Sequence, residues 1–241
     1  LYLENHSEIT APQTVKSKDG KITTEYKDGK GNIRKVRLLT WIPGRLWSSV
    51  KPHSNDLRFS LGMECGKLTQ VLQKFDHPEA HRSFEWDLAE SLWTQNHLHL
   101  FESEKKEILD YFQSLFKEHQ QSYKTLRKSV VHNDPNDNNI LVSSDFINPK
   151  VTAVIDFGDA VYTQTINDLA IACAYAMMQH RDPLEASLAV VRGYHQVFPL
   201  KEEELNHLFS CISMRLVTTV TKSAIGKIKE PDNAYLSISE K

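Results

Sequence analysis

Residues 130–142 read VVHNDPNDNNILV and decide the fold that we expect for this chain. The polar centre of the stretch is rich in Asn, Asp and Pro, which favour turns because they preset φ or bond to their own backbone. Taken alone, it is typical of a surface loop. Apolar residues bracket it closely, with Val130-Val131 before it and Ile140-Leu141-Val142 after it. We therefore expect a strand, a rigidly held loop and a second strand.

The next apolar run, Val151 to Ile155, brings a further carboxylate to this loop. It is separated from the second strand by residues 143–150, which contain turn formers. If the two runs pair as an antiparallel hairpin, the start of one strand lies beside the end of the other. Asn139 then lies next to Asp156, and Asp134 stands across the loop. The sequence thus predicts that one amide oxygen and one or two carboxylates meet at a single point.

Oxygen ligands such as Asn139 and Asp156 suit Mg²⁺, which takes one or two protein carboxylates and fills its octahedron with water and phosphate oxygens. Phosphoryl transfer needs a metal on the nucleotide phosphates and a base that accepts the proton of the attacking hydroxyl. A solvent-facing Asp134 beside the metal fits the role of that base. The pattern therefore predicts a kinase-type site.

Two other metal sites compete with this interpretation. Asp134, Asn136, Asn138 and Asp145 occupy the first, third, fifth and twelfth positions of an EF-hand count. However, the sixth position lacks the expected Gly, the twelfth lacks Glu, and no amphipathic helices flank the loop. His132 with the carboxylates could also indicate a transition-metal hydrolase, but no second histidine stands at ligand spacing.

The segments after Gly44 are expected to be mostly helical. Ser54 can cap a helix whose apolar stripe runs from Leu57 to Phe75, and Gly62 and Gly66 lie one turn apart on it, which would let another backbone pack closely. Further helices are expected over Ser103–Gln121, Ile166–Met178, from Asp182 onward and Glu202–Lys222. Ile166–Met178 is apolar nearly all round, which predicts a central position.

The first forty residues are expected to form β structure. Asp19-Gly20 favours a hairpin between Thr14–Lys16 and Lys21–Tyr26. A second turn at Asp28–Asn32 leads into Arg34–Ile42, whose continuous apolar end is typical of a strand that is buried on both faces. We divide the chain at this point into residues 1–42, a remnant of a β-rich lobe with its hinge, and residues 43–241, a helical lobe. The predicted class is α+β with two segregated lobes.

The composition bounds the function. The 241 residues are 40% hydrophobic and 25% charged, with a net charge of -2, so no strong positive field indicates nucleic acid as a partner. No apolar run approaches the roughly 20 residues that span a bilayer. Three scattered cysteines (Cys65, Cys173 and Cys211) sit among apolar neighbours, as expected of buried thiols in a cytoplasmic protein. Nothing here determines the oligomeric state.

His132-x-Asp134-x4-Asn139 followed by Ile155-Asp156-Phe157-Gly158-Asp159 resembles the catalytic signature of the aminoglycoside phosphotransferase and choline kinase superfamily, which is related to protein kinases. The resemblance extends from about Pro12 onward. Three further stretches look most like the hydroxylysine kinase group, which includes modules fused to class III aminotransferases: Arg37–Gly44, Phe75–Pro78 and Trp86–Leu88.

The resemblance implies a role for each matching residue. Asp134 would be the catalytic base, with His132 bracing its loop, and Asn139 and Asp156 would hold Mg²⁺. The hinge that binds the base of ATP or GTP would comprise Leu39, Thr40 and Trp41. Asp168 would support the catalytic loop, and Asp159 and Asp137 could face the acceptor or lie behind it. The acceptor would be a small, cationic hydroxyl compound such as hydroxylysine, homoserine, choline or an aminoglycoside.

The chain also departs from the family pattern. Asn133 stands where many members have Gly, which indicates a position of positive φ that Asn tolerates. No phosphate-binding Lys with a Glu partner is identifiable, since Lys16, Lys18 and Lys21 read as exposed and no Lys of the family pattern supports Glu4 or Glu8 in the role of its partner. We therefore expect a fragment that begins in the tail of a helix, Leu1–His6, and stops at Tyr235–Lys241 without a helix C-cap.

The absent Lys keeps a second function open, a nucleotide-binding pseudokinase or ligand-sensing regulator without transfer activity. A third function, a protein kinase, is disfavoured because nothing between Asp156 and Asp168 resembles a long activation segment.

Overall fold

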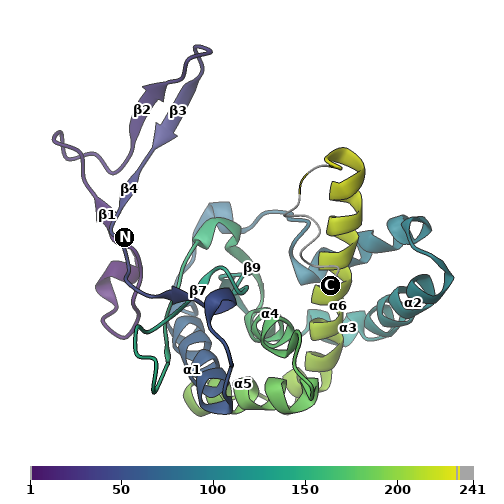
Figure 1. Ribbon diagram of the computed structural model, residues 1–241. Helices are drawn as coiled ribbons and strands as arrows, with labels where there is room; N and C mark the ends of the chain where they lie inside the picture. Colours follow the sequence, from purple (N-terminus) through teal and green to yellow (C-terminus); the bar gives the residue numbers. More distant parts are fainter. Residues whose placement is uncertain (1, 232, 234–241) are drawn as a thin grey trace.

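The computed structural model describes residues 2–231 and Asn233, and within them α-helices form most of the chain after residue 50 (Figure 1). The expected chain end at Tyr235–Lys241 lies outside the described residues. The α-helices are α1 (Asn55–Leu72), α2 (Ser103–Glu118), α3 (Gln120–Lys124), α4 (Ile166–Met177), α5 (Pro183–Val197) and α6 (Glu202–Lys229). Turns of 3-10 helix are η1 (Leu3–Asn5), η2 (Trp47–Ser49), η3 (Pro78–Ala80), η4 (Leu88–Leu100) and η5 (Phe157–Asp159).

Helix α1 begins as expected, because the Ser54 side chain accepts a hydrogen bond from the backbone N–H of Leu57. Its glycines allow α5 to pack at backbone distance. A Cβ at Gly62 would lie 1.9 Å from the carbonyl oxygen of Val190, and one at Gly193 on α5 would lie 2.0 Å from that of Phe59. The prediction that Gly62 and Gly66 admit another backbone is therefore confirmed.

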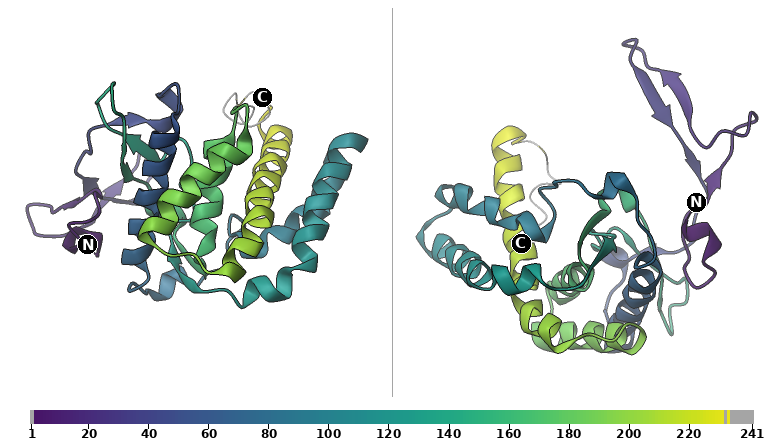
Figure 2. Two further views of the ribbon diagram at one scale, coloured as in Figure 1. Left: turned by 90° about the horizontal axis from the view of Figure 1, so that it is seen from below. Right: turned by 180° about the vertical axis from the view of Figure 1, so that it is seen from behind.

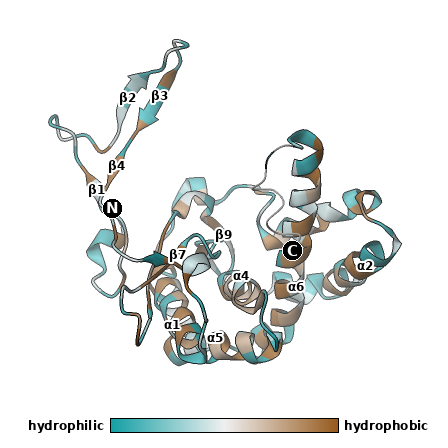
Figure 3. Cartoon of the chain, viewed as in Figure 1, coloured by the Kyte–Doolittle hydropathy of each residue, from teal (hydrophilic) through white to brown (hydrophobic). Residues whose placement is uncertain are grey.

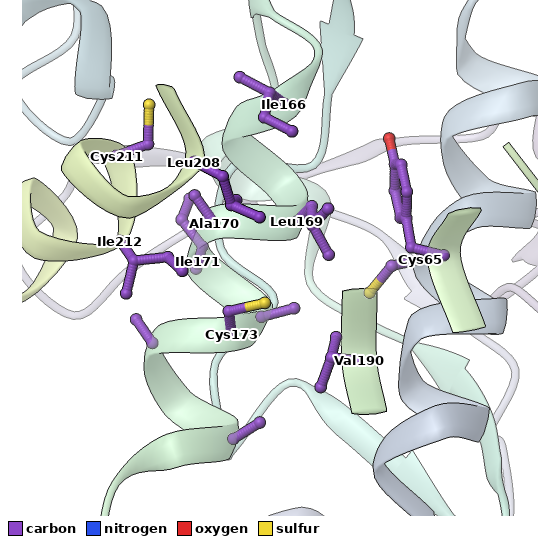
Figure 4. Close-up of a cluster of buried hydrophobic side chains, with 14 of the residues drawn as sticks. Cys65, Ile166, Leu169, Ala170, Ile171, Cys173, Val190, Leu208, Cys211 and Ile212 are labelled. Atoms are coloured by element: carbon purple, nitrogen blue, oxygen red, sulfur yellow. The ribbon is translucent and has the colours of Figure 1, made fainter. Parts of the chain in front are cut away.

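Helix α4 lies at the centre of the helical part, as its apolar sequence predicted. Ten of its residues are buried, and α5 and α6 pack against it. Figure 4 shows Leu169 and Ile171 of α4 among side chains from neighbouring helices, including Cys65, Val190 and Leu208. Seen from below, the helices follow one another across the molecule from α1 through α5 to α6 and α2 (Figure 2). All three cysteines are buried and free, as expected.

Two small sheets hold the polar loop between them. β7 (Ile140–Val142) is the middle strand of a three-stranded sheet, between β5 (Arg45–Leu46) and β8 (Val151–Val154). β7 and β8 are antiparallel, with Ile140 opposite Val154, which confirms the expected hairpin. β6 (Lys128–Val131) pairs with β9 (Val161–Gln164). β5 and β9 were not predicted, because two and four residues give little periodicity to detect.

The expected N-terminal hairpin is wrong in its pairing. The turn at Asp19-Gly20 is present, with Gly20 at φ 75°. However, β1 (Thr14–Val15) pairs with β4 (Leu38–Leu39), while β2 (Thr24–Lys27) pairs with β3 (Ile33–Val36) across the second turn. Register is weakly specified where neither face of a strand is buried. The turn at Asp19-Gly20 therefore does not determine which strands pair.

The expectation that Arg34–Ile42 forms a strand buried on both faces is also wrong. The segment is divided between β3 and β4, both exposed, and Trp41 is 87% exposed. The β2–β3 ribbon projects away from the helices, and its hydropathy is mixed along its length (Figures 1 and 3). Residues Leu3–Asn5 form a single 3-10 turn rather than the expected tail of a helix.

The other helices differ from expectation mainly in their ends. Helix α2 stops at Glu118, before the expected Gln121, and α6 continues to Lys229 beyond the expected Lys222. Within residues 2–231 and Asn233, no helix combines the length and apolar character that crossing a membrane requires.

Candidate active site

The polar loop is anchored to helix α4 by one buried carboxylate. Asp168, in the first turn of α4, accepts hydrogen bonds from the backbone N–H groups of His132 at 2.9 Å and Asn133 at 2.7 Å. Asn133 has φ 67°, the left-handed conformation that was expected at this position. Two bonds to one rigid acceptor hold the loop in this conformation. The geometry matches the supporting role that we expected of Asp168.

The His132 ring bridges the two strands that flank the site. Its Nδ1 accepts from the backbone N–H of Asp134 at 3.1 Å, so Nε2 carries the proton and donates to the carbonyl of Ile155 at 2.9 Å. Both ring nitrogens are occupied by the protein's own backbone. A transition-metal site that uses His132 is therefore inconsistent with this arrangement, and a bracing function fits it.

Asp134 is held from two sides. Its Oδ2 accepts from the side-chain amides of Asn136 at 2.7 Å and Asn139 at 2.8 Å. Its Oδ1 accepts from Arg215 Nη2 of α6 at 2.6 Å. The Asp134 side chain is 19% exposed, so it is still open to a ligand despite these bonds. The sequence suggested a solvent-facing Asp134, but it did not indicate these three side-chain bonds.

Asn139 and Asp156 come together at the end of the β7–β8 hairpin. The backbone N–H of Ile155 donates to the carbonyl of Asn139 at 2.9 Å, which fixes the residues on either side. The side-chain amide nitrogen of Asn139 donates to the backbone carbonyl and to Oδ2 of Asp134. Its Oδ1 takes no hydrogen bond within the described part of the chain. Asp156 is exposed, and its Oδ1 accepts from the N–H of Gly158 at 3.2 Å.

One amide oxygen and one exposed carboxylate fit a metal that completes its shell with phosphate and water oxygens, as Mg²⁺ does. Among residues 2–231 and Asn233, no cluster of three or more His, Cys, Asp or Glu side chains could hold a metal ion. The described residues therefore favour a shared nucleotide–metal site over a cage made by the protein alone.

The EF-hand interpretation is not supported. The side-chain oxygen of Asn138 accepts from the Ser48 hydroxyl at 3.0 Å, outside the loop. Asp145 lies on the β7–β8 connection, where it accepts from the backbone N–H of Ile147 at 2.8 Å. These oxygens are committed to structural bonds and do not converge with Asp134.

A cavity of about 810 Å³ adjoins the site and has a mainly apolar lining. Asp156 and Phe157 line it, and so do the expected hinge residues Leu39, Thr40 and Trp41. Its size and lining are those of a small-molecule site. The structure thus brings Asp156 to one cavity with the residues that we expected to form a hinge, although they are more than a hundred positions apart in the sequence.

Asp159 and Asp137 lie at the border of the site. Burial raises the pKa of the half-buried Asp159 carboxyl, and the charge of Asp134 acts in the same direction. Burial likewise raises the pKa of Asp137. The backbone carbonyl of Asp137 accepts from the N–H of Ser48 at 2.9 Å, so Asp137 also ties the loop to η2.

Sequence reasoning missed two arginines of this site. Arg82 donates to the carbonyls of Gly158 at 2.9 Å and Ala160 at 3.2 Å, and so holds the turn after Asp156. Arg215 contacts Asp134 from 81 positions away. The signal for Arg215 was a lone Arg within the otherwise apolar and small-residue stretch Cys211–Thr219 of an expected helix. A buried charge on a helix usually has a partner, but the sequence does not say which.

In comparisons with known proteins, this chain is similar to phosphotransferases and small-molecule kinases. Residues 2–203 match the phosphotransferase enzyme family. Hydroxylysine kinase of Bos taurus is 31% identical over 219 residues, which cover 86% of this chain and 58% of that protein. Homoserine kinase of Zymomonas mobilis subsp. mobilis is 30% identical over 205 residues, 81% of this chain and 58% of that protein. The chain thus spans less than two thirds of the length of these two curated relatives.

Among solved structures, a microcompartment-associated aminopropanol kinase superposes with a TM-score of 0.70 at 20% identity. The match covers 99% of this chain and 77% of the other. At this identity the likeness shows the fold alone. It confirms the expected α+β, kinase-like architecture with a mostly helical C-terminal part.

Proposed function

Because the chain belongs to the phosphotransferase enzyme family, we propose that the protein transfers the γ-phosphate of a nucleoside triphosphate to a hydroxyl group of a small amine or amino acid. The observation that carries this proposal is the meeting of Asp134, Asn139 and Asp156 at the end of one hairpin, beside an apolar cavity. The hydroxylysine and homoserine kinases among its relatives support a small hydroxyl acceptor.

In this proposal Asp134 is the base. It orients the acceptor hydroxyl and takes its proton as the phosphoryl group moves to the oxygen. His132 and Asp168 act through the loop, because their bonds to backbone groups fix where Asp134 stands. The bonds of Asn136 and Asn139 to Oδ2 restrict the carboxylate to one rotamer.

Asn139 and Asp156 would hold Mg²⁺, which when bound neutralises phosphate charge. Leu39, Thr40 and Trp41 would contact the nucleotide base. Because backbone groups usually bind the base, the nucleotide would be either ATP or GTP. We accordingly assign residues 1–42 to a nucleotide-binding lobe with its hinge and residues 43–241 to a catalytic and acceptor-binding lobe. The separate pairing of β1 with β4 and of β2 with β3 supports that division.

The acceptor is proposed to carry a positive charge. The charge of Asp134 contributes to the raised pKa of Asp159, which places the two carboxylates near each other. Asp137 precedes Asn139, the proposed metal ligand, by two positions. An ammonium group near either carboxylate would be favoured by Coulomb attraction in a half-buried setting.

A panel of acceptors tests the proposal. Nucleotide turnover is coupled to ADP or GDP formation with hydroxylysine, homoserine, choline, 1-amino-2-propanol and kanamycin. We expect turnover with at least one acceptor that contains both an amine and a hydroxyl group, and phosphate on that hydroxyl by mass spectrometry. Turnover with none of the five, from a folded protein that binds nucleotide, would contradict the proposal.

A second candidate, nucleotide binding without transfer, is supported by one observation. Among the described residues that line the cavity, Arg37 is a basic side chain and no lysine is present. A regulator of this kind would bind nucleotide with an affinity that changes when an acceptor is added, yet release no diphosphate. The same panel separates the two functions, because calorimetric binding can be measured where turnover is zero.

A further inference from the structure

Arg215 has an unusual setting for a side chain that contacts the proposed base. Its side chain is 3% exposed, and Nη2 donates both to Asp134 Oδ1 at 2.6 Å and to the Tyr175 hydroxyl at 3.3 Å. The guanidinium carbon lies 4.9 Å from the ring centroid of Trp86 and 5.5 Å from that of Tyr175. These contacts hold the group firmly beside Asp134.

The hydrogen bonding of this guanidinium is incomplete. Nε and Nη1 are buried and have no acceptor within the described residues. An arginine carries five N–H donors and cannot lose its charge, and a buried donor without a partner destabilises the protein. The hydroxyl of Thr218, three positions further along α6, is also buried without a partner. The face of α6 beside Asp134 therefore offers more donors than the protein itself satisfies.

Asp134 is the anionic side chain that forms an ion pair with Arg215 within the described residues. Burial alone would lower the pKa of the guanidinium, but Tyr175 and Asp134 outweigh it. A second anion that reached Arg215 would gain a charge-assisted hydrogen bond, the strong class of such bonds. The arrangement thus suits an anionic ligand group within a few ångström of Asp134.

The position of Arg215 indicates which ligand, the nucleotide or the acceptor, would carry that anionic group. The cavity with the expected hinge residues is lined by Asp156 and Phe157, and neither Asp134 nor Arg215 lines it. Arg215 lies near Asp159, because the charge of Arg215 acts to lower the pKa of the Asp159 carboxyl. Arg215 therefore contacts Asp134 from outside the lining of the cavity that we assign to the nucleotide, and the acceptor would approach Asp134 beside it. Asp159 and Arg215 together provide one negative and one positive group there.

We propose that Arg215 binds the carboxylate of the acceptor, so that the enzyme selects hydroxy amino acids over amino alcohols of the same shape. This inference rests on the proposed function. The rings of Trp86 and Tyr175 approach the guanidinium within cation–π distance, and the unpaired donors at its edge are the ones that a carboxylate would take. Arg215 is then shared between Asp134 and the acceptor, and it ties the substrate to the residue that takes its proton.

The transferred phosphoryl group is the other anion that could reach Arg215. Substrate pairs that differ only in the carboxylate separate the two sources. L-homoserine is compared with L-homoserinamide, and 5-hydroxylysine with its amide, in the wild type and in Arg215→Gln and Arg215→Lys. Lys222→Gln serves as the matched control, because Lys222 lies two turns along α6, pairs with Glu85 and also contacts Trp86. The readout is the ratio of kcat/KM for acid over amide within each protein.

We expect the wild type to prefer the acid by about ten- to a hundredfold, the range of a hydrogen bond to a charged group. The preference should fall to within about threefold in Arg215→Gln, be intermediate in Arg215→Lys and persist in Lys222→Gln. Because each ratio is internal to one protein, a general loss of activity does not affect it. Should Arg215→Gln not fold, the acid-over-amide ratio of Arg215→Lys is compared with that of the wild type, and an unchanged ratio counts against the inference.

Several outcomes would overturn the inference. Equal use of acid and amide by the wild type would leave the kinase function intact but remove carboxylate recognition. A preference that persists in Arg215→Gln, with or without an equal loss of rate for acid and amide, would place the carboxylate elsewhere. If no phosphate is transferred at all, calorimetric binding of L-homoserine and L-homoserinamide decides, and equal affinity or no binding of either counts against the inference.

Discussion

The backbone N–H of Ile155 donates to the carbonyl of Asn139 across 2.9 Å. This bond extends the β7–β8 pairing one step beyond the Ile140–Val154 pair and sets Asn139 beside Asp156. Two residues that are 17 positions apart are thus fixed by strand geometry, and the loop between them contributes no flexibility to their separation. The proposed metal site therefore depends on main-chain bonds that substitution of the ligand side chains leaves in place.

Replacing Asn139 with Ala should raise the Mg²⁺ concentration needed for half-maximal turnover by at least about tenfold, because one of two protein ligands is lost. Turnover is measured against Mg²⁺ at a fixed nucleotide concentration, and each curve is scaled to its own maximum. Asn138→Ala is the matched control, since Asn138 is the exposed neighbour whose amide bonds to Ser48. Equal magnesium requirements in the two variants would remove Asn139 from the metal site.

Replacing Gly62 with Ala should destabilise the fold by at least about 1–3 kcal/mol, the usual cost of overpacking. The added Cβ would lie 1.9 Å from the Val190 carbonyl oxygen, so α1 and α5 would have to separate. Gly29→Ala is the control, because nothing lies within 4 Å of its Cβ position and Gly29 is not at positive φ. Denaturant unfolding of both variants measures the difference, and equal stabilities would contradict the close contact between α1 and α5.

Replacing Glu64 with Gln should flatten the pH dependence of stability in the acidic range. Burial raises the pKa of Glu64 above its ordinary 4.5, and the charge of Lys67 only partly opposes this. The native state therefore binds the proton more tightly than the unfolded state. This contribution to the free energy of unfolding is fully present below pH 4.5 and is lost as the pH rises through the raised value.

Urea unfolding between about pH 4 and neutrality tests this prediction, with the exposed Glu79→Gln as the control. The wild type and the control should lose stability as the pH rises through that window. Glu64→Gln should lack that part of the fall. An identical slope in all three proteins would show that Glu64 is not the group responsible.

The sequence was informative where structure is local. The loop between Val131 and Ile140 could be predicted with its hairpin because apolar runs bound it within a few residues. The caps at Ser54 and Asp182 were likewise predictable, since each side chain bonds to a backbone N–H three residues on. Such contacts need no knowledge of how distant elements pack.

The sequence was misleading or silent where structure is not local. Neither face of the strands around Asp19-Gly20 is buried, so no buried face selects their partners, and the pairing of Thr14 with Leu39 could not be foreseen. The contact of Arg215 with Asp134 spans 81 positions and depends on how α6 crosses the site. Periodicity predicted the helix but not which residue its one buried arginine would meet.

The proposed phosphoryl transfer depends above all on Asp134, and the substitution Asp134→Asn tests it most directly. Nucleotide affinity and turnover are measured for this variant and for Asp145→Asn, whose exposed carboxylate only holds the β7–β8 turn. We predict that Asp134→Asn binds nucleotide nearly as tightly as the wild type while its turnover falls by about a hundredfold or more, the contribution of a general base. Asp145→Asn should retain turnover. Near-normal turnover in a folded Asp134→Asn variant would contradict the account.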